Sequence, residues 1–241
     1  MSHTLLMRLA GPMQSWGLSS RFSERDSGLE PSKSGVVGIL AAALGRPRDG
    51  DVADLAALSM GVRADKEGVL SYDFHTAGAS KTQPGIIRAQ GRGYSTSISR
   101  RFHLQDAVFL VGLEGDDLTQ IEALDVALRE PVFPVGLGRR GHVPSCPVAM
   151  AGAAGAGVRR DTALAEALRQ EPWPVAEIPH WQQRRLEQAG DGVRLVLEDP
   201  AGSITRPDQP VGAAFRTRVF GPRSVVVTWC QPPRRETDRD Q

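Results

Sequence analysis

The chain has 241 residues, of which 40% are hydrophobic and 5% aromatic, and its formal net charge is +1. These values predict one large or two small folded domains, and they exclude a disordered chain and a uniformly basic nucleic-acid-binding protein. Two cysteines, Cys146 and Cys230, are too few for a disulfide scaffold or a multi-cysteine zinc site. No apolar run approaches the roughly 20 residues that cross a bilayer, and the N-terminus lacks a secretion signal. We therefore expect a cytoplasmic protein with no membrane partner.

The first half of the chain alternates between strand and helix signals. The predicted strands are His3–Leu9 (ended by the turn signal Gly11–Pro12), Val62–Ala64, Val69–Phe74, Arg101–Gly112 and Pro131–Val135. The predicted helices are Ser32–Leu44, Asp51–Ser59 and Asp116–Glu130. The resulting β-α-β-β-α-β order is that of the ferredoxin-like fold, an α+β fold that RNA-recognition domains also use.

The character of the chain changes after Ala149, where the sequence AGAAGAG forms a flexible joint. A short helix is predicted at Thr162–Gln170, and strands are predicted at Val193–Leu197 and Arg223–Trp229. We therefore predict a first domain at 1–150, a smaller β-rich region at 151–230 and a disordered polar tail at 231–241.

Basic residues are segregated along the chain despite its small net charge. The stretch from Phe74 to Gln105 has no Asp or Glu, and its basic residues are Lys81, Arg88, Arg92, Arg100 and Arg101. The stretch 131–160 also lacks acidic residues and contains Arg139 and Arg140, whereas acidic residues collect at 106–130. A basic face on a nearly neutral protein favours a polyanionic ligand. The alternative is that basic loops and acidic helices are merely solvated.

Two phosphate-binding motifs are matched only in part. Gly136–Gly141 fits G-x-G-x-x-G, but Pro144 and Pro147 follow where a dinucleotide-binding fold needs a helix. The segment Gly136–Gly141 is still a glycine-rich loop, whose backbone amides and two arginines can bind phosphate. Pro31–Ser34 resembles the end of a P-loop without the required glycines. The five histidines fall at no metal-ligand spacing, so we expect neither a metal nor a cofactor.

Two longer segments carry a resemblance to a known family. They are Leu9–Gly17 (LAGPMQSWG), followed by Arg21-Phe22, and Pro31–Gly38 (PSKSGVVG). Weaker likeness continues at 73–76, 137–140 and 145–147. In these segments the chain resembles the CasD family of the RAMP group of RNA-binding proteins, which are subunits of the type I-E Cascade, a CRISPR surveillance complex.

The resemblance implies a ferredoxin-like RAMP domain with a long basic hairpin, the thumb, at about residues 77–102 of this sequence, and a smaller β-rich C-terminal region. It implies a non-catalytic subunit that grips the 5′ handle of CRISPR RNA, caps the backbone filament and supports RNA-guided defence against foreign DNA. The implied partners are CRISPR RNA, the backbone subunit CasC, the large subunit CasA and, indirectly, target DNA.

The resemblance, together with the charge pattern, gives a set of candidate RNA-binding residues and no catalytic residue. They are Ser15, Trp16, Arg21, Lys33, Ser34, Arg88, Arg92, Arg100, Arg101, Arg139 and Arg140. Two of these residues have an alternative role to RNA binding. Trp16 is a candidate for the hydrophobic core, and Arg21 is a candidate for a structural ion pair. Arg100 and Arg101 are neighbours, so on a strand they point to opposite faces, and at most one of them faces a given RNA segment.

Two other functions stay open. His75, Lys81 and Tyr94 supply side chains for metal-independent acid–base cleavage, which would make the protein an endoribonuclease that processes CRISPR repeat RNA. Nothing in the spacing of these residues requires that activity. The third reading is a structural subunit whose basic face contacts an acidic protein.

Overall fold

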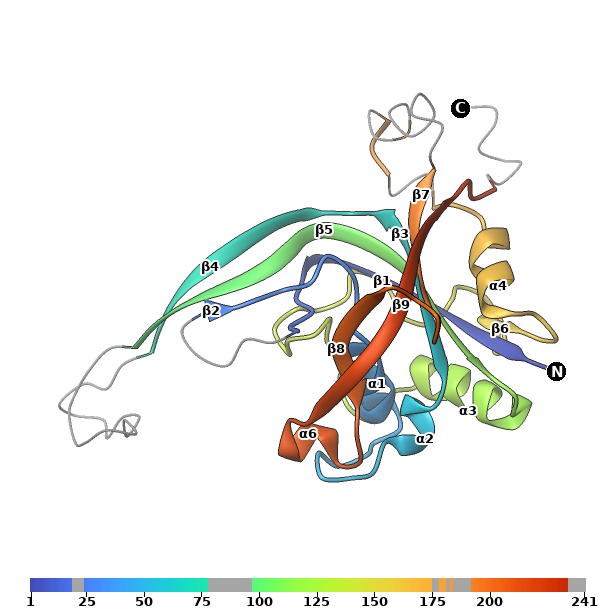
Figure 1. Cartoon of the computed structure of the whole chain (residues 1–241), viewed down its shortest axis with the longest axis horizontal. Coiled ribbons are helices and arrows are strands. Elements are labelled where there is room, and N and C mark those ends of the chain that lie inside the picture. Colours follow the sequence, from blue (N-terminus) through green and yellow to red (C-terminus); the bar gives the residue numbers. More distant parts are fainter. Residues whose placement is uncertain (19–23, 78–96, 175–177, 181–182, 184–191, 234–241) are drawn as a thin grey trace.

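The computed structural model describes residues 1–18, 24–77, 97–174, 178–180, 183 and 192–233. The strands are β1 His3–Gln14, β2 Glu24–Arg25, β3 Ser59–Lys66, β4 Val69–Ala77, β5 Ser97–Gly115, β6 Val158–Arg159, β7 Val193–Glu198, β8 Ile204–Pro210 and β9 Phe220–Cys230. The helices are α1 Lys33–Ala43, α2 Ala53–Ala56, α3 Leu118–Arg129, α4 Leu164–Gln170 and α6 Ala214–Thr217. Figure 1 shows a body from which the long hairpin of β4 and β5 projects.

One sheet organises the described chain, in the order β6-β1-β5-β3-β7-β9-β8, and β2 and β4 pair with β5 outside this path. All pairings are antiparallel except that of β2 with β5. In chain order, β1, α1, β3, β5, α3 and β6 match the predicted β-α-β-β-α-β order. The α+β class is therefore confirmed.

Two predictions for the first half are wrong. Pro131–Val135 is a loop, in which the amides of Val132 and Phe133 donate to the last turn of α1 rather than to a strand. The fourth strand of the series is the two-residue β6. Nor does Gly11–Pro12 end the first strand, because β1 passes Pro12 and pairs on to Gln14. Pro12 has no paired residue on β5, so its missing N–H breaks no sheet hydrogen bond.

The C-terminal strands extend the same sheet from β3. Strand β7 pairs with β3 and β9 pairs with β7, as continuations of the first-half sheet. Strand β8 was not predicted because its sequence, ITRPDQP, contains two prolines. It lies at the end of the sheet order, and an edge strand tolerates proline. The boundary near residue 150 stays a prediction.

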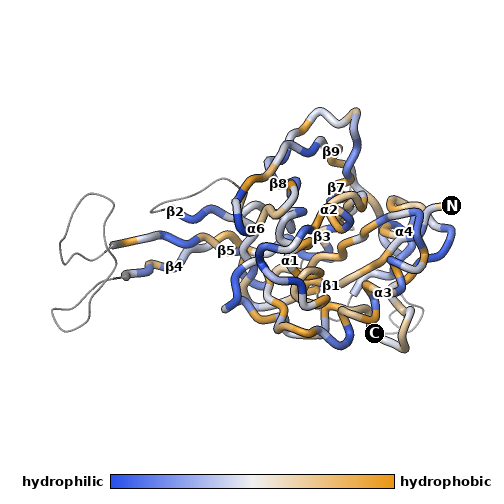
Figure 2. Tube along the Cα trace, turned by 90° about the horizontal axis from the view of Figure 1, so that it is seen from below, coloured by the Kyte–Doolittle hydropathy of each residue, from blue (hydrophilic) through white to orange (hydrophobic). Residues whose placement is uncertain are grey.

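Apolar side chains fill the layer between the sheet and α1 and α3, and Figure 2 shows the hydrophobic segments gathered in the body. Ser32 starts α1 by accepting a hydrogen bond from the Gly35 amide at 3.3 Å. Trp16 is fully buried, and a Cβ at Gly35 would lie 2.7 Å from its ring. The G-P-x-Q-S-W-G and P-S-K-S-G segments therefore pack on each other. None of the helices among the described residues is long and apolar enough to span a membrane.

Helix α4 is held to the sheet by a buried ion pair. Arg63 and Asp65 are both 0% exposed, and Nε of Arg63 donates to Oδ1 of Asp65 at 2.6 Å. One Arg63 nitrogen also donates to the carbonyls of Leu168 and Glu171 at the end of α4, each at 2.6 Å. The guanidinium thus satisfies carbonyls that the helix itself leaves unpaired.

Asp125 on α3 links stability to pH. Burial raises its pKa, but the hydrogen bond from Arg129 at 2.8 Å and the amide of Gly155 at 2.7 Å outweigh this and hold it below the ordinary 3.8. Its stabilising contribution is therefore present above pH 3.8 and lost as the pH falls through the lowered value. We expect Asp125→Asn to lower the free energy of unfolding by about 1.5–3 kcal/mol at neutral pH and by less at about pH 3, which lies below the ordinary pKa of 3.8.

Urea unfolding at both pH values measures this difference. Glu122→Gln is the control on the same helix, because Glu122 pairs with Arg160 at 2.5 Å on the surface. We expect this control to change stability by less than about 0.5 kcal/mol. An equal loss for Asp125→Asn at both pH values would contradict the linkage.

Candidate nucleic-acid interface

The hairpin of β4 and β5 has two different faces. Asp73 pairs with Arg101 and His75 pairs with Ser99, so these side chains share one face. The other face carries exposed apolar side chains together with Arg100, whose guanidinium lies 5.7 Å from the centre of the Tyr72 ring. These apolar residues are Leu70, Tyr72, Phe74 and Ile98. Arg100 and Arg101 thus lie on opposite faces, as expected for neighbours on a strand.

The glycine-rich loop 136–142 is fixed against the end of β1. The Ser15 amide donates to the Leu137 carbonyl at 3.0 Å, and the Leu137 amide donates to the His142 carbonyl at 2.8 Å. Gly138 has φ +87°, and a Cβ there would lie 1.7 Å from the Ser15 carbonyl oxygen. The loop therefore needs glycine at 138, and its close packing on Ser15 sets the direction of Arg139.

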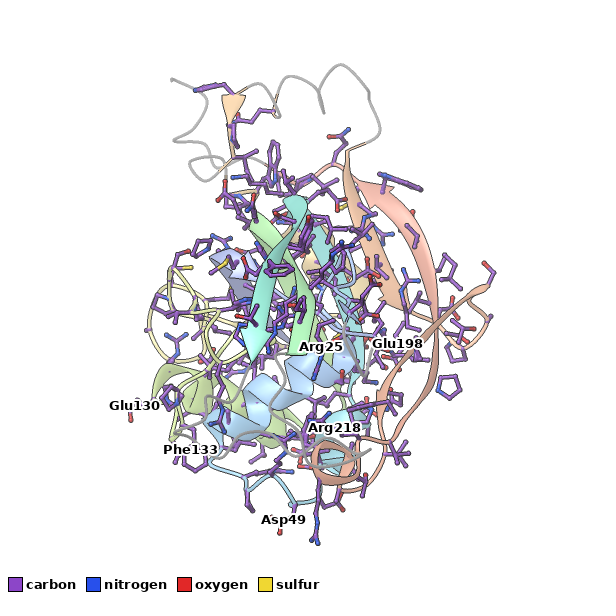
Figure 3. The ribbon with its side chains drawn as sticks, turned by 90° about the vertical axis from the view of Figure 1, so that its left-hand side faces the viewer. Arg25, Asp49, Glu130, Phe133, Glu198 and Arg218 are labelled. Atoms are coloured by element: carbon purple, nitrogen blue, oxygen red, sulfur yellow. The ribbon has the colours of Figure 1, made fainter. Side chains whose placement is uncertain are left out.

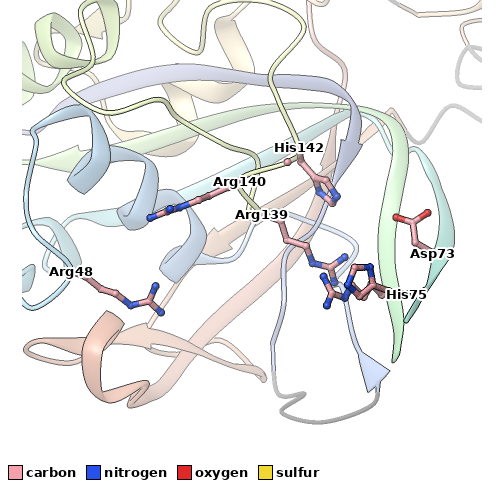
Figure 4. A pocket seen from close by; sticks show the side chains of 8 residues that line it. Arg48, Asp73, His75, Arg139, Arg140 and His142 are labelled. Atoms are coloured by element: carbon pink, nitrogen blue, oxygen red, sulfur yellow. The ribbon is translucent and has the colours of Figure 1, made fainter. Parts of the chain in front are cut away.

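A cleft of about 520 Å³ lies between this loop and the polar face of the hairpin. It is lined by Arg48, Asp73, His75, Arg101, Arg139, Arg140, Gly141 and His142. Figure 4 shows Arg139 and His142 reaching from the loop toward the β4 residues, while Arg140 points toward the side where Arg48 lies. Four of the eight lining residues are arginines and one is acidic, so the cleft is suited to an anion.

Arg139 lies close to two other arginines of this region. Burial, together with the like charges of Arg101 and Arg25, lowers the pKa of its guanidinium. Arg25 lies beside Arg101 in the register of β2 and β5, and its carbonyl accepts a hydrogen bond from Arg139 at 3.4 Å. Figure 3 shows Arg25 near the middle of the side from which the hairpin projects. Three clustered guanidinium groups are stabilised when a bound anion offsets their repulsion.

Two buried histidines pack beside the cleft. His103 and His142 are 2% and 6% exposed, and their ring centres are 6.0 Å apart. Burial lowers the pKa of His142 below 6.5, and the charge of Arg139 lowers it further. Nδ1 of His103 lies 3.7 Å from the Asp73 carboxylate. Nδ1 of neither ring has a hydrogen-bond partner among the described residues.

The predicted residues of the two N-terminal motifs that the structure describes are mostly buried. Ser15 is 4% exposed, and its hydroxyl donates to the Phe102 carbonyl at 2.7 Å. Trp16 takes the core position that was its alternative. Ser34 is half-buried, with its hydroxyl 3.3 Å from that of Ser32. These side chains support the loop and α1, whereas Arg101, Arg139 and Arg140 line the cleft.

Lys33 is a buried structural cation. It is 1% exposed, and its ammonium donates to both carboxylate oxygens of Glu198 at 2.9 and 3.0 Å. Its backbone amide, at the start of α1, donates to the Asp208 carboxylate at 2.8 Å, and Asp208 also pairs with Arg223. Burial lowers the pKa of Lys33, against the charge of Glu198. The helix terminus that resembles a phosphate site thus holds carboxylates of β7 and β8.

Two further arginines near the cleft were not predicted: Arg48 lines it, and Arg25 lies beside Arg139. Arg48 is held by a hydrogen bond from its Nε to the Phe215 carbonyl at 3.0 Å. Both arginines have acidic residues within one or two positions in the sequence, so neither stands in an acid-free stretch. The predicted residues Arg21, Arg88 and Arg92, with Lys81 and Tyr94 of the acid–base alternative, lie outside the described residues.

The chain is similar to known CRISPR-associated proteins along most of its length. A family model described as "CRISPR-associated protein (Cas_Cas5)" matches residues 4–226. The CRISPR system Cascade subunit CasD of Escherichia coli (strain K12) is 36% identical over 160 residues, which span 60% of this chain and 66% of that protein. A solved structure described as "Crystal structure of Cas protein" has a TM-score of 0.71 and 39% identity, over 96% of this chain and 98% of the other. A chain of a "CRISPR RNA-guided surveillance complex" has a TM-score of 0.74 and 32% identity, over 95% and 91%.

Proposed function

The chain belongs to the CRISPR-associated Cas5 protein family, and from that premise we propose that it is a non-catalytic Cascade subunit that binds the 5′ handle of CRISPR RNA. In this role it caps one end of the backbone filament and supports RNA-guided defence against foreign DNA. CRISPR RNA, the backbone subunit CasC and the large subunit CasA are its proposed partners, and target DNA is an indirect one.

The observation that supports this proposal best is the arginine cleft. Arg101, Arg139 and Arg140 come from two segments without acidic residues, and the fold brings them to one cleft. Arginine binds phosphate through several N–H donors, and single-stranded RNA presents its phosphates and unstacked bases to such a surface. The similarity to a chain of an RNA-guided surveillance complex supports the same ligand.

A binding assay with the host's labelled CRISPR repeat RNA tests the proposal. Purified full-length protein is incubated with this RNA in EDTA and run on native and denaturing gels. We expect a shifted, intact RNA band that unlabelled handle RNA competes away. A discrete RNA product that disappears in a His75→Ala variant would instead make the protein a processing endoribonuclease.

The double variant Arg139→Ala, Arg140→Ala tests the cleft itself. We expect its affinity for handle RNA to fall about 100-fold or more, because each of the two arginine–phosphate hydrogen bonds contributes roughly 1.5 kcal/mol or more. The slope of log affinity against log salt should become shallower by about 1.4, since single strands give about 0.7 per contact. Fluorescence anisotropy over a salt series measures both values.

Arg216→Ala, Arg218→Ala is the matched control. It removes the same charge from two exposed arginines at α6, outside the cleft. This control should bind RNA more tightly than the cleft variant does. Equal affinities for the two variants would overturn the assignment of the cleft. RNA-independent binding to an acidic partner subunit, retained after RNase treatment, would favour the structural role.

A further inference from the structure

Three buried histidines differ in what their Nδ1 atoms contact. In His3, Nδ1 accepts a hydrogen bond from the Asp161 amide at 3.1 Å. In His103, Nδ1 makes no hydrogen bond among the described residues either, but it lies 3.7 Å from the Asp73 carboxylate, which is an acceptor for a ring N–H. In His142, Nδ1 is buried and has no hydrogen-bond partner in the described part of the chain. An unpaired buried polar atom is costly, and in a folded protein it points to a bound water, ion or ligand.

The surroundings of His142 indicate which kind of ligand atom this nitrogen meets. His142 lines the cleft together with four arginines, and guanidinium groups donate hydrogen bonds but accept none. A neutral imidazole has one accepting nitrogen. Burial, followed by the charges of Arg139 and His103, disfavours protonation of His142, whereas the Asp73 carboxylate and a hydrogen bond of the His142 ring with the Leu137 backbone oppose this. His142 therefore brings a hydrogen-bond acceptor into a cleft built mainly of donors.

RNA bound in this cleft would bring hydrogen-bond donors to this surface. When the phosphates of a strand contact the arginines, the ribose 2′-hydroxyls of the same nucleotides lie nearby, and each can donate a hydrogen bond. Asp73 and His75 are the other lining side chains that can accept one. The Asp73 side chain is 58% exposed, so water already solvates its carboxylate. His75 is exposed as well, which leaves His142 as the lining acceptor that is buried.

We propose that Nδ1 of His142 accepts a hydrogen bond from a ribose 2′-hydroxyl of RNA held in the arginine cleft, and that this contact selects RNA over DNA. The inference rests on the proposed function and adds to it a residue that reads the sugar. His142 is thus a specificity-determining residue, whereas the arginines bind phosphate, which RNA and DNA share.

A 2′-deoxy scan tests this proposal. The affinity of the full-length protein is measured by fluorescence anisotropy for handle RNA and for strands in which one nucleotide at a time is 2′-deoxy. We expect one position at which the wild-type protein loses about 3- to 10-fold in affinity, the effect of one hydrogen bond. His142→Leu should bind the RNA and that deoxy strand equally well. His142→Asn keeps a side-chain acceptor and should restore part of the preference.

Three further measurements make the result decisive. His3→Leu is the matched control, because it removes a buried histidine whose Nδ1 is already paired; it should keep the wild-type preference. Circular dichroism checks that each variant folds. His142→Phe is a second variant without an acceptor, for use if His142→Leu does not fold.

A preference for the 2′-hydroxyl that survives in the variants without an acceptor, or one that only Asp73→Asn removes, overturns the proposal. If the wild-type protein binds no RNA, the proposed function fails as well; if it binds RNA without a 2′-hydroxyl preference, only this inference fails.

Discussion

Asp65→Ala is expected to lower the free energy of unfolding by about 3–5 kcal/mol, because it leaves the Arg63 guanidinium buried without its carboxylate. Both side chains are 0% exposed, so water cannot replace the lost partner without opening the structure. The loss should extend to α4, since the same guanidinium binds the carbonyls of Leu168 and Glu171. Urea unfolding followed by circular dichroism measures the change.

The control for this prediction is an ion pair of similar length on the surface. Arg46 and Asp54 are 2.6 Å apart, with side chains 29% and 47% exposed. Asp54→Ala should cost less than about 1 kcal/mol, because water solvates the remaining arginine. If the two variants lose the same stability, the buried pair has no special role in holding α4.

Gly138→Ala is expected to disable the cleft. Alanine at φ +87° carries a backbone strain of about 1–3 kcal/mol. Its Cβ would also lie 1.7 Å from the Ser15 carbonyl oxygen, so the loop must leave its place on β1. Arg139 and His142 move with the loop. We therefore expect handle RNA affinity to fall at least tenfold, the effect expected from losing one charged hydrogen bond to phosphate.

Gly141→Ala is a control within the same loop. A Cβ at Gly141 meets no atom within 4 Å, and no left-handed φ is required there. Gly141 itself lines the cleft, so this variant is a control for the stability of the loop, and it should keep a thermal midpoint close to the wild-type value. The anisotropy assay and a thermal melt compare the two variants. Wild-type affinity in Gly138→Ala would show that the loop geometry does not position the RNA ligand.

The sequence predicted the elements whose signals are local. The helix at Ser32–Leu44 was found from its start and stop signals, and the structure places α1 at Lys33–Ala43 with Ser32 as its cap. The acid-free stretches contain Arg101, Arg139 and Arg140, which line the cleft. That these residues bind RNA stays a prediction. Stretches without acidic residues can be read directly from the sequence, and the fold places two of them beside one cleft.

The features that the sequence did not predict depend on contacts between residues far apart in the chain. Lys33 was placed beside RNA by resemblance, but its ammonium is bound to Glu198, 165 residues away. No local pattern pairs these two residues. Strand β8 was missed because its prolines are tolerated only at a sheet edge, and the sheet order is a property of the whole chain. Only the folded chain brings Arg48 to the cleft and Arg25 beside Arg139.

The pairing of early with late segments has a consequence for synthesis of the protein. Lys33 leaves the ribosome 165 residues before its partner Glu198. At translation rates of about 5–20 residues per second, this separation lasts roughly 8–33 s. On β3, Val62 pairs with Val196 of β7, so this edge of β3 lacks its partner for roughly 7–27 s at the same rates. The nascent chain therefore exposes an unpaired strand edge until β7 is made, a period in which chaperones protect such surfaces.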